Sequence, residues 1–389
     1  MLARTADKLF SFNFTDEIRF SKAIYYHFRP IPLPQPFQDA TGGIGQYLPE
    51  KGYLELTDDM GFTSHYTVNP DFVKETLPKL LNGKKLSYNQ WRETLYWQIR
   101  NSGFQSAQAV QVGIADLMML DILSQRAGKP LHRFLGADKD WAAAYKGGGS
   151  ILLEDDQLVE EMERYVSEGF STVKFKVGSG RGKDMERDLR RIRKVRQALG
   201  DNVNIAVDAN QSWQEADAVR FAALTEPYHL AWIEEPIHSH DYNGIKRLKD
   251  QMTQRLAFGE SMRIYYAYET YVEKGVDILQ PSLGRMSRID DLIRIRDLAR
   301  DNGLIFQSGG RTAYNAIFGC LYNENEPVEF HAPISEPMHS YMLGVPDIRS
   351  GKCFVQNDIP GIPVRINLEK LEREGYLESK TYYVPDRFC

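Results

Sequence analysis

From about residue 141 onward, short apolar runs alternate with longer amphipathic segments, and this rhythm constrains the fold more than any other feature of the chain. Most of the runs are 22 to 34 residues apart, which is typical of repeated strand–loop–helix units that build a parallel sheet. Eight such strands within about 200 residues favour a closed barrel over an open, doubly wound sheet. The runs are AAYKGGGS, STVKFKV, VNIAVDAN, LAWIEEP, RLAFGES, VDILQPS, GLIFQSG and PVEFHAP.

The two ends of the chain lack this rhythm. Residues 1–140 begin with strand-like runs joined by a loop rich in Pro and Gly (residues 30–52), and helical patterns follow up to Gly136, which fits a helix stop. The tail, residues 350–389, again holds strand and helix pieces. We therefore expect an α/β protein with an α+β layer formed by residues 1–140 and the tail, and a barrel over residues 141–349.

Composition and charge exclude several classes of partner. The chain is 42% hydrophobic and 26% charged, with a formal net charge of −5 and a pI of about 6.0, so no basic field favours nucleic acid or an anionic membrane. There is no signal-peptide pattern and no run of 18 apolar residues. Three widely spaced cysteines are typical of free thiols in a reducing compartment. We expect a cytoplasmic homo-oligomer that acts on a small molecule.

The run STVKFKVG places two lysines on one face of a strand. Side chains alternate along a strand, so Lys174 and Lys176 point to one side while Val173, Phe175 and Val177 point to the other. Two explanations are open at this point: an antiparallel edge strand with one face in water, or a functional pair on a buried strand.

Acidic residues end the next three strand-like runs. Asp208 stands in VDAN, Glu234 and Glu235 in WIEEP, and Glu260 in FGES, with 26 residues from Asp208 to Glu234 and 26 from Glu234 to Glu260. In a parallel barrel these positions meet at the C-terminal rim, where active sites are built. Crowded carboxylates repel one another unless a cation lies among them, and all-oxygen ligation favours Mg²⁺. Alternation along the strand does not choose between Glu234 and Glu235.

The two lysines end the preceding strand at the same rim, which favours the functional explanation. A lysine beside a divalent cation and a second ammonium group has its charged form disfavoured, so it can act as a base near neutral pH. The spacing therefore predicts that one lysine removes a proton and the other holds an anionic substrate or tunes its neighbour.

KxK, VDAN, WIEEP and FGES at these spacings resemble the enolase superfamily, in particular its mandelate racemase and muconate-lactonising branches. The resemblance implies a (β/α)₇β barrel, a capping domain made by residues 1–140 with the tail, and Mg²⁺ that stabilises the enediolate formed when a proton α to a carboxylate is removed. It also implies roles for single residues. The metal ligands would be Asp208, Glu234 and Glu260, the base Lys176, its companion Lys174, and a neighbouring substrate or supporting group Asn210.

The chain departs from that pattern at the sixth and seventh strands. Ser282 stands where the mandelate racemase pattern has an Asp, and Gly309 where it has a His, so that second base is absent. Where the muconate branch has a lysine, this chain has Arg285, which is always protonated and suits an oxyanion or carboxylate clamp. Glu329 stands where the family often has an acid near the substrate, with His331 on the same face.

One obvious base favours β-elimination over racemisation, and the polar rim suits a polyhydroxylated acid. We therefore predict a lyase that dehydrates a sugar acid, an aldonate or aldarate, to a 2-keto-3-deoxy acid. A racemase, epimerase or cycloisomerase is the alternative, and a non-catalytic metal-binding barrel is a third. By the same resemblance, the loop of residues 30–52 would cover the barrel mouth. The predicted substrate-binding residues are Asn210, Gln280, Arg311, His331 and, from this loop, Tyr47.

Overall fold

The computed structural model describes residues 11–385 and contains the eight predicted strands, which pair in parallel in chain order. The last of them, β15, pairs with the first, β8. Each run is short because its apolar side chains are packed on both sides; Val173 and Phe175, for example, are fully buried. The strands are β8 (Trp141–Gly148), β9 (Thr172–Lys176), β10 (Asn204–Asp208), β11 (Ile233–Glu234), β12 (Leu256–Phe258), β13 (Ile278–Leu279), β14 (Ile305–Phe306) and β15 (Val328–His331).

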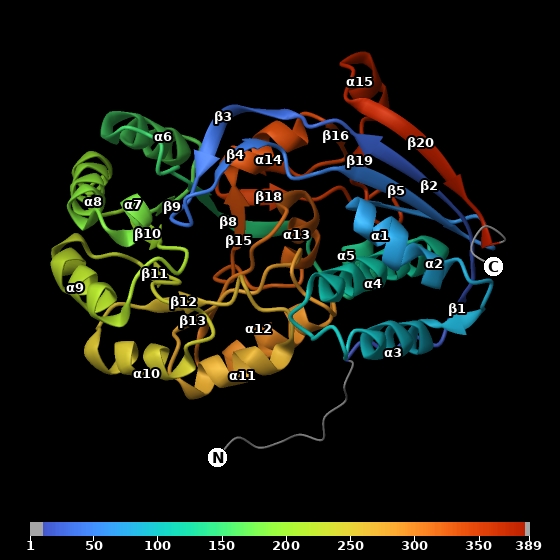
Figure 1. The fold of residues 1–389 in the computed structure, drawn as a ribbon, viewed down its shortest axis with the longest axis horizontal. Coiled ribbons are helices and arrows are strands. Elements are labelled where there is room, and N and C mark those ends of the chain that lie inside the picture. Colours follow the sequence, from blue (N-terminus) through green and yellow to red (C-terminus); the bar gives the residue numbers. More distant parts are fainter. Residues whose placement is uncertain (1–10, 386–389) are drawn as a thin grey trace.

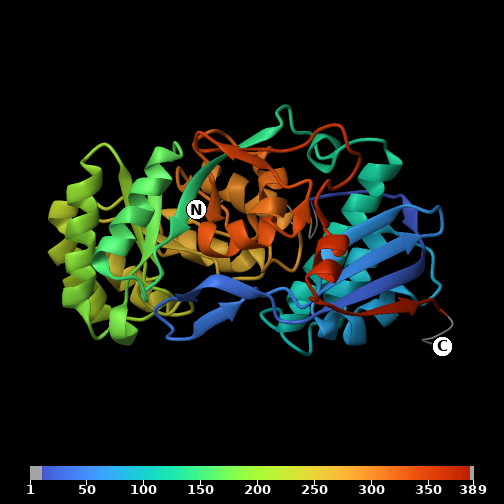
Figure 2. The same ribbon diagram turned by 90° about the horizontal axis from the view of Figure 1, so that it is seen from above.

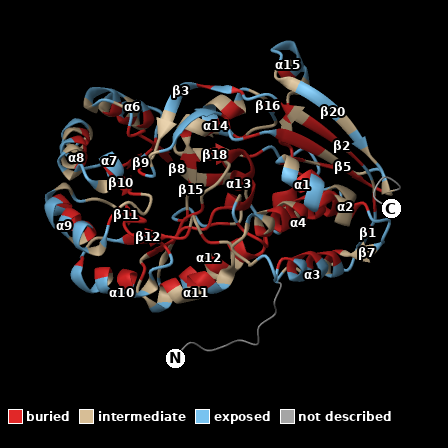
Figure 3. Cartoon of the chain, in the orientation of Figure 1, coloured by how far each residue is buried: buried red, intermediate tan, exposed pale blue. Residues whose placement is uncertain are grey.

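Helices connect these strands and lie outside them (Figure 1). Figure 3 shows that buried residues gather on the strands and on the inward faces of the helices. In α8, Ile192 and Val195 are fully buried, as the apolar stripe of this segment predicts. The helices are α6 (Asp155–Ser167), α7 (Ser179–Gly182), α8 (Met185–Leu199), α9 (Glu215–Thr225), α10 (Tyr242–Gln251), α11 (Tyr265–Glu273), α12 (Asp291–Asp301), α13 (Thr312–Gly319) and α14 (Ala332–His339), with a 3₁₀ turn η1 (Glu226–Tyr228) after α9.

The N-terminal residues form a separate antiparallel sheet with helices on one side (Figure 2). The strand order is β20-β2-β5-β6, so the end of the chain pairs with β2 at the other end of the sequence. These strands are β2 (Phe20–Phe28), β5 (Gly52–Asp58), β6 (Thr63–Thr67) and β20 (Leu377–Tyr383). The helices of this layer are α1 (Pro70–Glu75), α2 (Leu77–Leu80), α3 (Tyr88–Gln98), α4 (Ala107–Arg126) and α5 (Leu131–Phe134).

Helix α4 is long and apolar enough to cross a bilayer, judged by length and composition only. However, 78% of its most apolar stretch is buried inside the protein, as expected for the central helix of a packed core. Gly113 lies where α4 meets the loop before α12, because a Cβ there would come within 2.0 Å of the Met286 carbonyl oxygen.

A hairpin and several short strands complete the described part of the chain. The hairpin of β3 and β4 falls within the Pro- and Gly-rich loop, and β18 pairs antiparallel with the beginning of β8. These elements are β1 (Glu17–Ile18), β3 (Pro32–Gln38), β4 (Ile44–Tyr47), β7 (Leu86–Ser87), β16 (Met342–Leu343), β17 (Asp347–Arg349), β18 (Lys352–Phe354), β19 (Arg365–Ile366) and α15 (Leu368–Arg373).

A buried charge network joins the N-terminal layer to the parallel sheet. Arg92 of α3 pairs with Asp290, which precedes α12, and its Nε lies 3.1 Å from Oδ1 of Asp116 in α4. Tyr88 donates to the same Asp116 oxygen at 2.7 Å. Partnered charges of this kind are costly to separate once buried, so the network fixes how the two layers meet.

Of the cysteines, Cys320 and Cys353 are free and buried, and Cys389 lies outside the described residues. Burial raises the pKa of each of the two described thiols to about 12, so both are unreactive at neutral pH.

Candidate active site

Three carboxylates meet at the C-terminal ends of neighbouring parallel strands. Asp208 ends β10 and stands in register with Glu234, which ends β11, and Glu260 follows β12 by two residues. One carboxylate oxygen from each lies within 4.8 Å of the others. Asp208 and Glu234 are buried, whereas the Glu260 side chain is 41% exposed. An all-oxygen donor set of this size fits a hard divalent cation such as Mg²⁺.

Glu235, which alternation could not distinguish from Glu234, is turned away from this cluster. Its backbone φ is 38°, in the left-handed region, and its carboxylate accepts hydrogen bonds from Ser239 Oγ at 2.7 Å and Gln211 Nε2 at 2.9 Å. Gln211 and Asn210 also have positive φ, at 65° and 42°. Strained backbone of this kind at the ends of two neighbouring strands is typical of functional sites.

The two lysines of β9 face the carboxylates. Lys174 Nζ donates to both oxygens of Glu234 at 2.8 Å and lies 3.0 Å from Glu329 Oε1, while Lys176 Nζ donates to Asp208 Oδ2 at 2.6 Å. Both are nearly inaccessible to solvent, so β9 is not an edge strand with one face in water.

The expected pKa shift of the lysines is opposite to the one that the protein groups alone produce. Burial lowers the pKa of Lys176, but the Asp208 carboxylate outweighs burial and raises it. Lys174 behaves in the same way because of Glu234 and Glu329. Burial in turn raises the pKa of Glu234 to about 8 against the opposing effect of Lys174. The expectation of a lowered pKa rested on a divalent cation among these carboxylates, which is not part of the protein.

Glu329 and His331 of β15 lie at the same site, on one face of the strand. Gly147 of β8 makes room for the acid, because a Cβ at that position would come within 2.4 Å of Glu329 Oε1. Burial lowers the pKa of His331 to about 4, so the imidazole is neutral at pH 7. Its ring meets the edge of Phe37 from β3 at 5.0 Å, which brings the hairpin of the predicted covering loop to the site.

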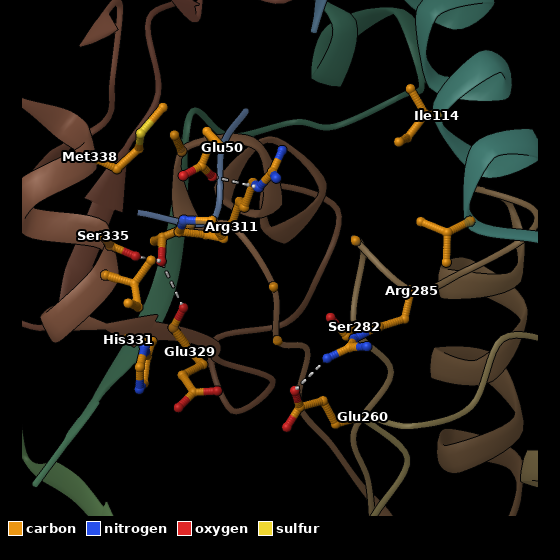
Figure 4. Close-up of a pocket in the computed structure, with 18 of the residues that line it drawn as sticks. Glu50, Ile114, Glu260, Ser282, Arg285, Arg311, Glu329, His331, Ser335 and Met338 are labelled. Carbon is orange, nitrogen blue, oxygen red and sulfur yellow. Dashed lines mark hydrogen bonds and ion pairs between the residues drawn. The ribbon is translucent and has the colours of Figure 1, made fainter. Parts of the chain in front are cut away.

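These groups open into a cavity of about 640 Å³ between the parallel sheet and the N-terminal layer (Figure 4). Ser282 and Gly309, which replace the second base of the mandelate racemase pattern, both line it. Lys174 and Asp208 are buried but are not part of the lining. The other predicted site residues that line it are Lys176, Asn210, Glu234, Glu260, Gln280, Arg285, Arg311, Glu329 and His331.

Tyr47 is the predicted residue that the structure places elsewhere. It is 52% exposed at the end of β4 and does not line the cavity. The alternation of the hairpin explains the error, since Phe37 and Asp39, on the other strand side of the hairpin and just after it, reach the cavity instead.

Hydrogen bonds fix the remaining predicted residues. Gln280 Nε2 donates to Glu234 Oε2 and to Gln307 Oε1, each at 3.0 Å, and Asn210 Nδ2 donates to Asp208 Oδ2 at 3.2 Å. Their amide oxygens, Oε1 and Oδ1, have no hydrogen-bond partner within residues 11–385. Both amides thus hold a proposed metal ligand and keep an oxygen in reserve.

The arginines of the cavity are paired to different degrees. Arg285 is 50% exposed, and its guanidinium lies 3.8 Å from Glu260. Arg311 Nε lies 3.0 Å from Oε1 of Glu50, a residue that sequence reasoning missed. Glu50 stands in the segment YLPEKGY before β5, where nothing in the local pattern distinguishes it from a solvated acid.

Residues 157–371 match the model of the enolase C-terminal domain-like family, which is 215 of the 389 residues. The chain belongs to this family. Its membership confirms the resemblance to the enolase superfamily that the motifs on β9 to β12 carry.

Relatives of this enolase-family chain carry out more than one reaction. The 3,6-anhydro-alpha-L-galactonate cycloisomerase of Streptomyces coelicolor is 27% identical over 360 residues, which cover 88% of this chain and 96% of the cycloisomerase. The L-talarate/galactarate dehydratase of Salmonella typhimurium is 31% identical over 234 residues, or 59% of this chain and 58% of the dehydratase.

Among solved structures, L-talarate dehydratase from Polaromonas sp. JS666, crystallised with Mg and L-glucarate, superposes with a TM-score of 0.77. The two chains are 22% identical, and the match covers 95% of this chain and 100% of the dehydratase. The likeness shows the fold of the family, a capping domain with a TIM barrel.

Proposed function

We propose that this protein is a Mg²⁺-dependent lyase that dehydrates a sugar acid to a 2-keto-3-deoxy acid. One observation carries the proposal: Lys176 and Glu329 line a single cavity beside three converging carboxylates, while the positions of a second base hold Ser282 and Gly309. A dehydratase of sugar acids among the relatives supports the substrate class.

In this proposal Asp208, Glu234 and Glu260 hold one Mg²⁺. When bound, the metal would neutralise charge that develops on the substrate carboxylate and compete with Lys176 for the Asp208 carboxylate. Lys176 then removes the proton from C2 of the substrate at its Nζ, and the resulting ammonium protonates the hydroxyl group that leaves from C3 as water. The enol that remains becomes the 2-keto-3-deoxy acid.

The other site residues position these groups. Lys174 holds Glu234 and Glu329 in place through ion pairs at 2.8 and 3.0 Å. Arg285 lies beside Glu260, where its guanidinium would bind the substrate carboxylate as that side chain turns to the metal. Neutral His331 and the amides of Asn210 and Gln280 would bind substrate hydroxyl groups.

The proposal extends to architecture. We propose that the parallel sheet closes into a (β/α)₇β barrel over residues 141–349 and that residues 1–140 with the tail 350–389 form the capping domain. The bridge of Ser308 with Val328 supports closure, because it joins the segment after β14 to β15. A cytoplasmic location and a homo-oligomeric state stay predictions.

The test is a screen of sugar acids for 2-keto products, with Mg²⁺ and with a chelator. Formation of a 2-keto-3-deoxy acid only with Mg²⁺ would support the proposal. A second reaction, cycloisomerisation, is favoured by the relative of nearly full coverage, and it would give an isomer of the substrate without loss of water. Binding of Mg²⁺ without turnover of any acid would favour a non-catalytic barrel.

A further inference from the structure

Glu50 is a buried acid that faces the cavity with half of its carboxylate unused. Its side chain is 1% exposed, and it lines the cavity. Oε1 is held 3.0 Å from Arg311 Nε, but Oε2 has no hydrogen-bond partner among residues 11–385. Buried carboxylate oxygens are normally hydrogen-bonded, so an unpartnered one in a cavity points to a donor supplied from outside the protein.

Arg311 cannot serve as a free carboxylate clamp in this arrangement. Its Nε faces Glu50 and its Nη1 donates to Thr67 Oγ1, so both ends of the guanidinium are held by the N-terminal layer. The pair is electrically neutral, and the group that it leaves open toward the cavity is the acceptor oxygen of Glu50. This corrects the prediction that Arg311 binds the substrate directly.

The pair lies away from the metal end of the cavity. Figure 4 shows Glu50 and Arg311 on the opposite side from Glu260, with the apolar side chains of Met338 and Ile114 flanking them. Arg285, by contrast, lies beside Glu260. A substrate whose carboxylate is at the metal would therefore place its other end near Glu50. Apolar neighbours strengthen both the attraction of a donor and the repulsion of an anion at this point.

We propose that Glu50 is a specificity-determining residue that accepts a hydrogen bond from a hydroxyl group at the end of the substrate remote from the metal. The inference rests on the proposed function and deepens it, because a hydroxyl satisfies Oε2 whereas a second carboxylate would face it with like charge. The protein then prefers aldonates, which carry one carboxylate, to aldarates, which carry two.

Matched pairs of six-carbon acids test this preference: D-gluconate with D-glucarate, D-galactonate with galactarate, and D-mannonate with D-mannarate. Within each pair only C6 differs, as a hydroxymethyl group or a carboxylate. With Mg²⁺ present, we expect kcat/KM for the best aldonate to exceed that of its matched aldarate by about 10- to 100-fold, the range that a like-charge contact produces. The terminal deoxy analogue of that aldonate should also be poorer, by about tenfold.

Glu50→Gln tests the residue itself. The amide keeps the shape, gives its oxygen to Arg311 and turns an NH₂ donor toward the cavity, so the ratio of aldonate to aldarate should fall at least about tenfold. Glu326→Gln is the matched control. Glu326 forms a similar pair with Arg300 at 2.6 Å and its side chain is 6% exposed, but it does not line the cavity. We expect that variant to keep the wild-type ratio.

The outcomes separate the two levels of the proposal. Conversion of an aldarate as fast as its matched aldonate by the wild type would overturn the role of Glu50 and leave the dehydratase proposal standing. An unchanged ratio in a folded Glu50→Gln protein would also overturn it. If that variant does not fold, the wild-type ratio and the deoxy analogue decide. No conversion of any acid would overturn the proposed function and this inference with it.

Discussion

Replacing Lys176 by Met should abolish turnover while leaving the metal site intact. Lys176 Nζ is the cationic nitrogen that lines the cavity beside the carboxylate cluster, and it is held by Asp208 at 2.6 Å. General base catalysis contributes about 10²- to 10⁴-fold, so kcat should fall by that factor. In free energy this is about 2.7 to 5.4 kcal/mol of transition-state stabilisation.

The same change should not weaken Mg²⁺ binding. The ammonium of Lys176 competes with a cation for Asp208, and its removal leaves the carboxylate more available. Isothermal titration with MgCl₂ should therefore give an affinity equal to or higher than that of the wild type. Loss of activity together with loss of metal would show instead that Lys176 only supports the structure.

Lys146→Met is the matched control. Lys146 is equally buried, at 1% exposed, but it lies on β8 outside the cavity, where it pairs with Glu168 and with Glu336 at 2.6 Å. Its partners are themselves more than a third exposed, so we expect a loss of only about 1–3 kcal/mol in unfolding free energy and unchanged kcat per folded molecule. If Lys176→Met exchanged the substrate C2 proton with solvent deuterium at the wild-type rate, another residue would be the base.

Three further predictions concern metal, packing and pH. Asp208→Asn should weaken Mg²⁺ binding at least about tenfold in titration calorimetry, and it should remove the stabilisation of about 2.7 kcal/mol that Mg²⁺ at 100 times Kd gives the wild type; an equal affinity would contradict the ligand assignment. Gly113→Ala should lower the free energy of unfolding in urea by about 1–3 kcal/mol, because the added Cβ meets the Met286 carbonyl, whereas Gly43→Ala, which faces open space, should not. Burial lowers the pKa of His339 to about 4, so the unfolded chain takes up its proton first and the melting temperature should fall as the pH drops from about 6.5 to 4; His339→Gln should flatten that dependence, and an unchanged profile would refute the assignment.

The strands and the acids of the site could be predicted because their signals are local. Each strand is a short apolar run, and a carboxylate at the end of such a run reaches the rim whatever the rest of the chain does. The equal spacing of Asp208, Glu234 and Glu260 then becomes three neighbouring positions once parallel pairing is assumed. The face of Lys174 and Lys176 followed from alternation alone.

What could not be predicted depends on contacts between distant segments. Glu50 and Arg311 meet only because the N-terminal layer packs over the sheet, and neither has a local signal. Arg191 belongs to a helix whose arginines would be expected to face solvent, yet it is fully buried and donates to backbone carbonyls, including those of Gly149 and Ser150. Tyr47 was assigned to the wrong side of its hairpin, because a hairpin pattern does not say which face packs.

The most direct test of the account follows the C2 proton of the substrate. The wild-type protein is incubated in D₂O with single five- and six-carbon sugar acids, either with MgCl₂ or with EDTA, and proton NMR records the C2 proton and any new product. We predict that at least one acid loses its C2 proton only with Mg²⁺ and yields a 2-keto-3-deoxy acid carrying one deuterium at C3. No loss of the C2 proton from any acid with Mg²⁺, or equal loss in EDTA, would contradict the proposed chemistry.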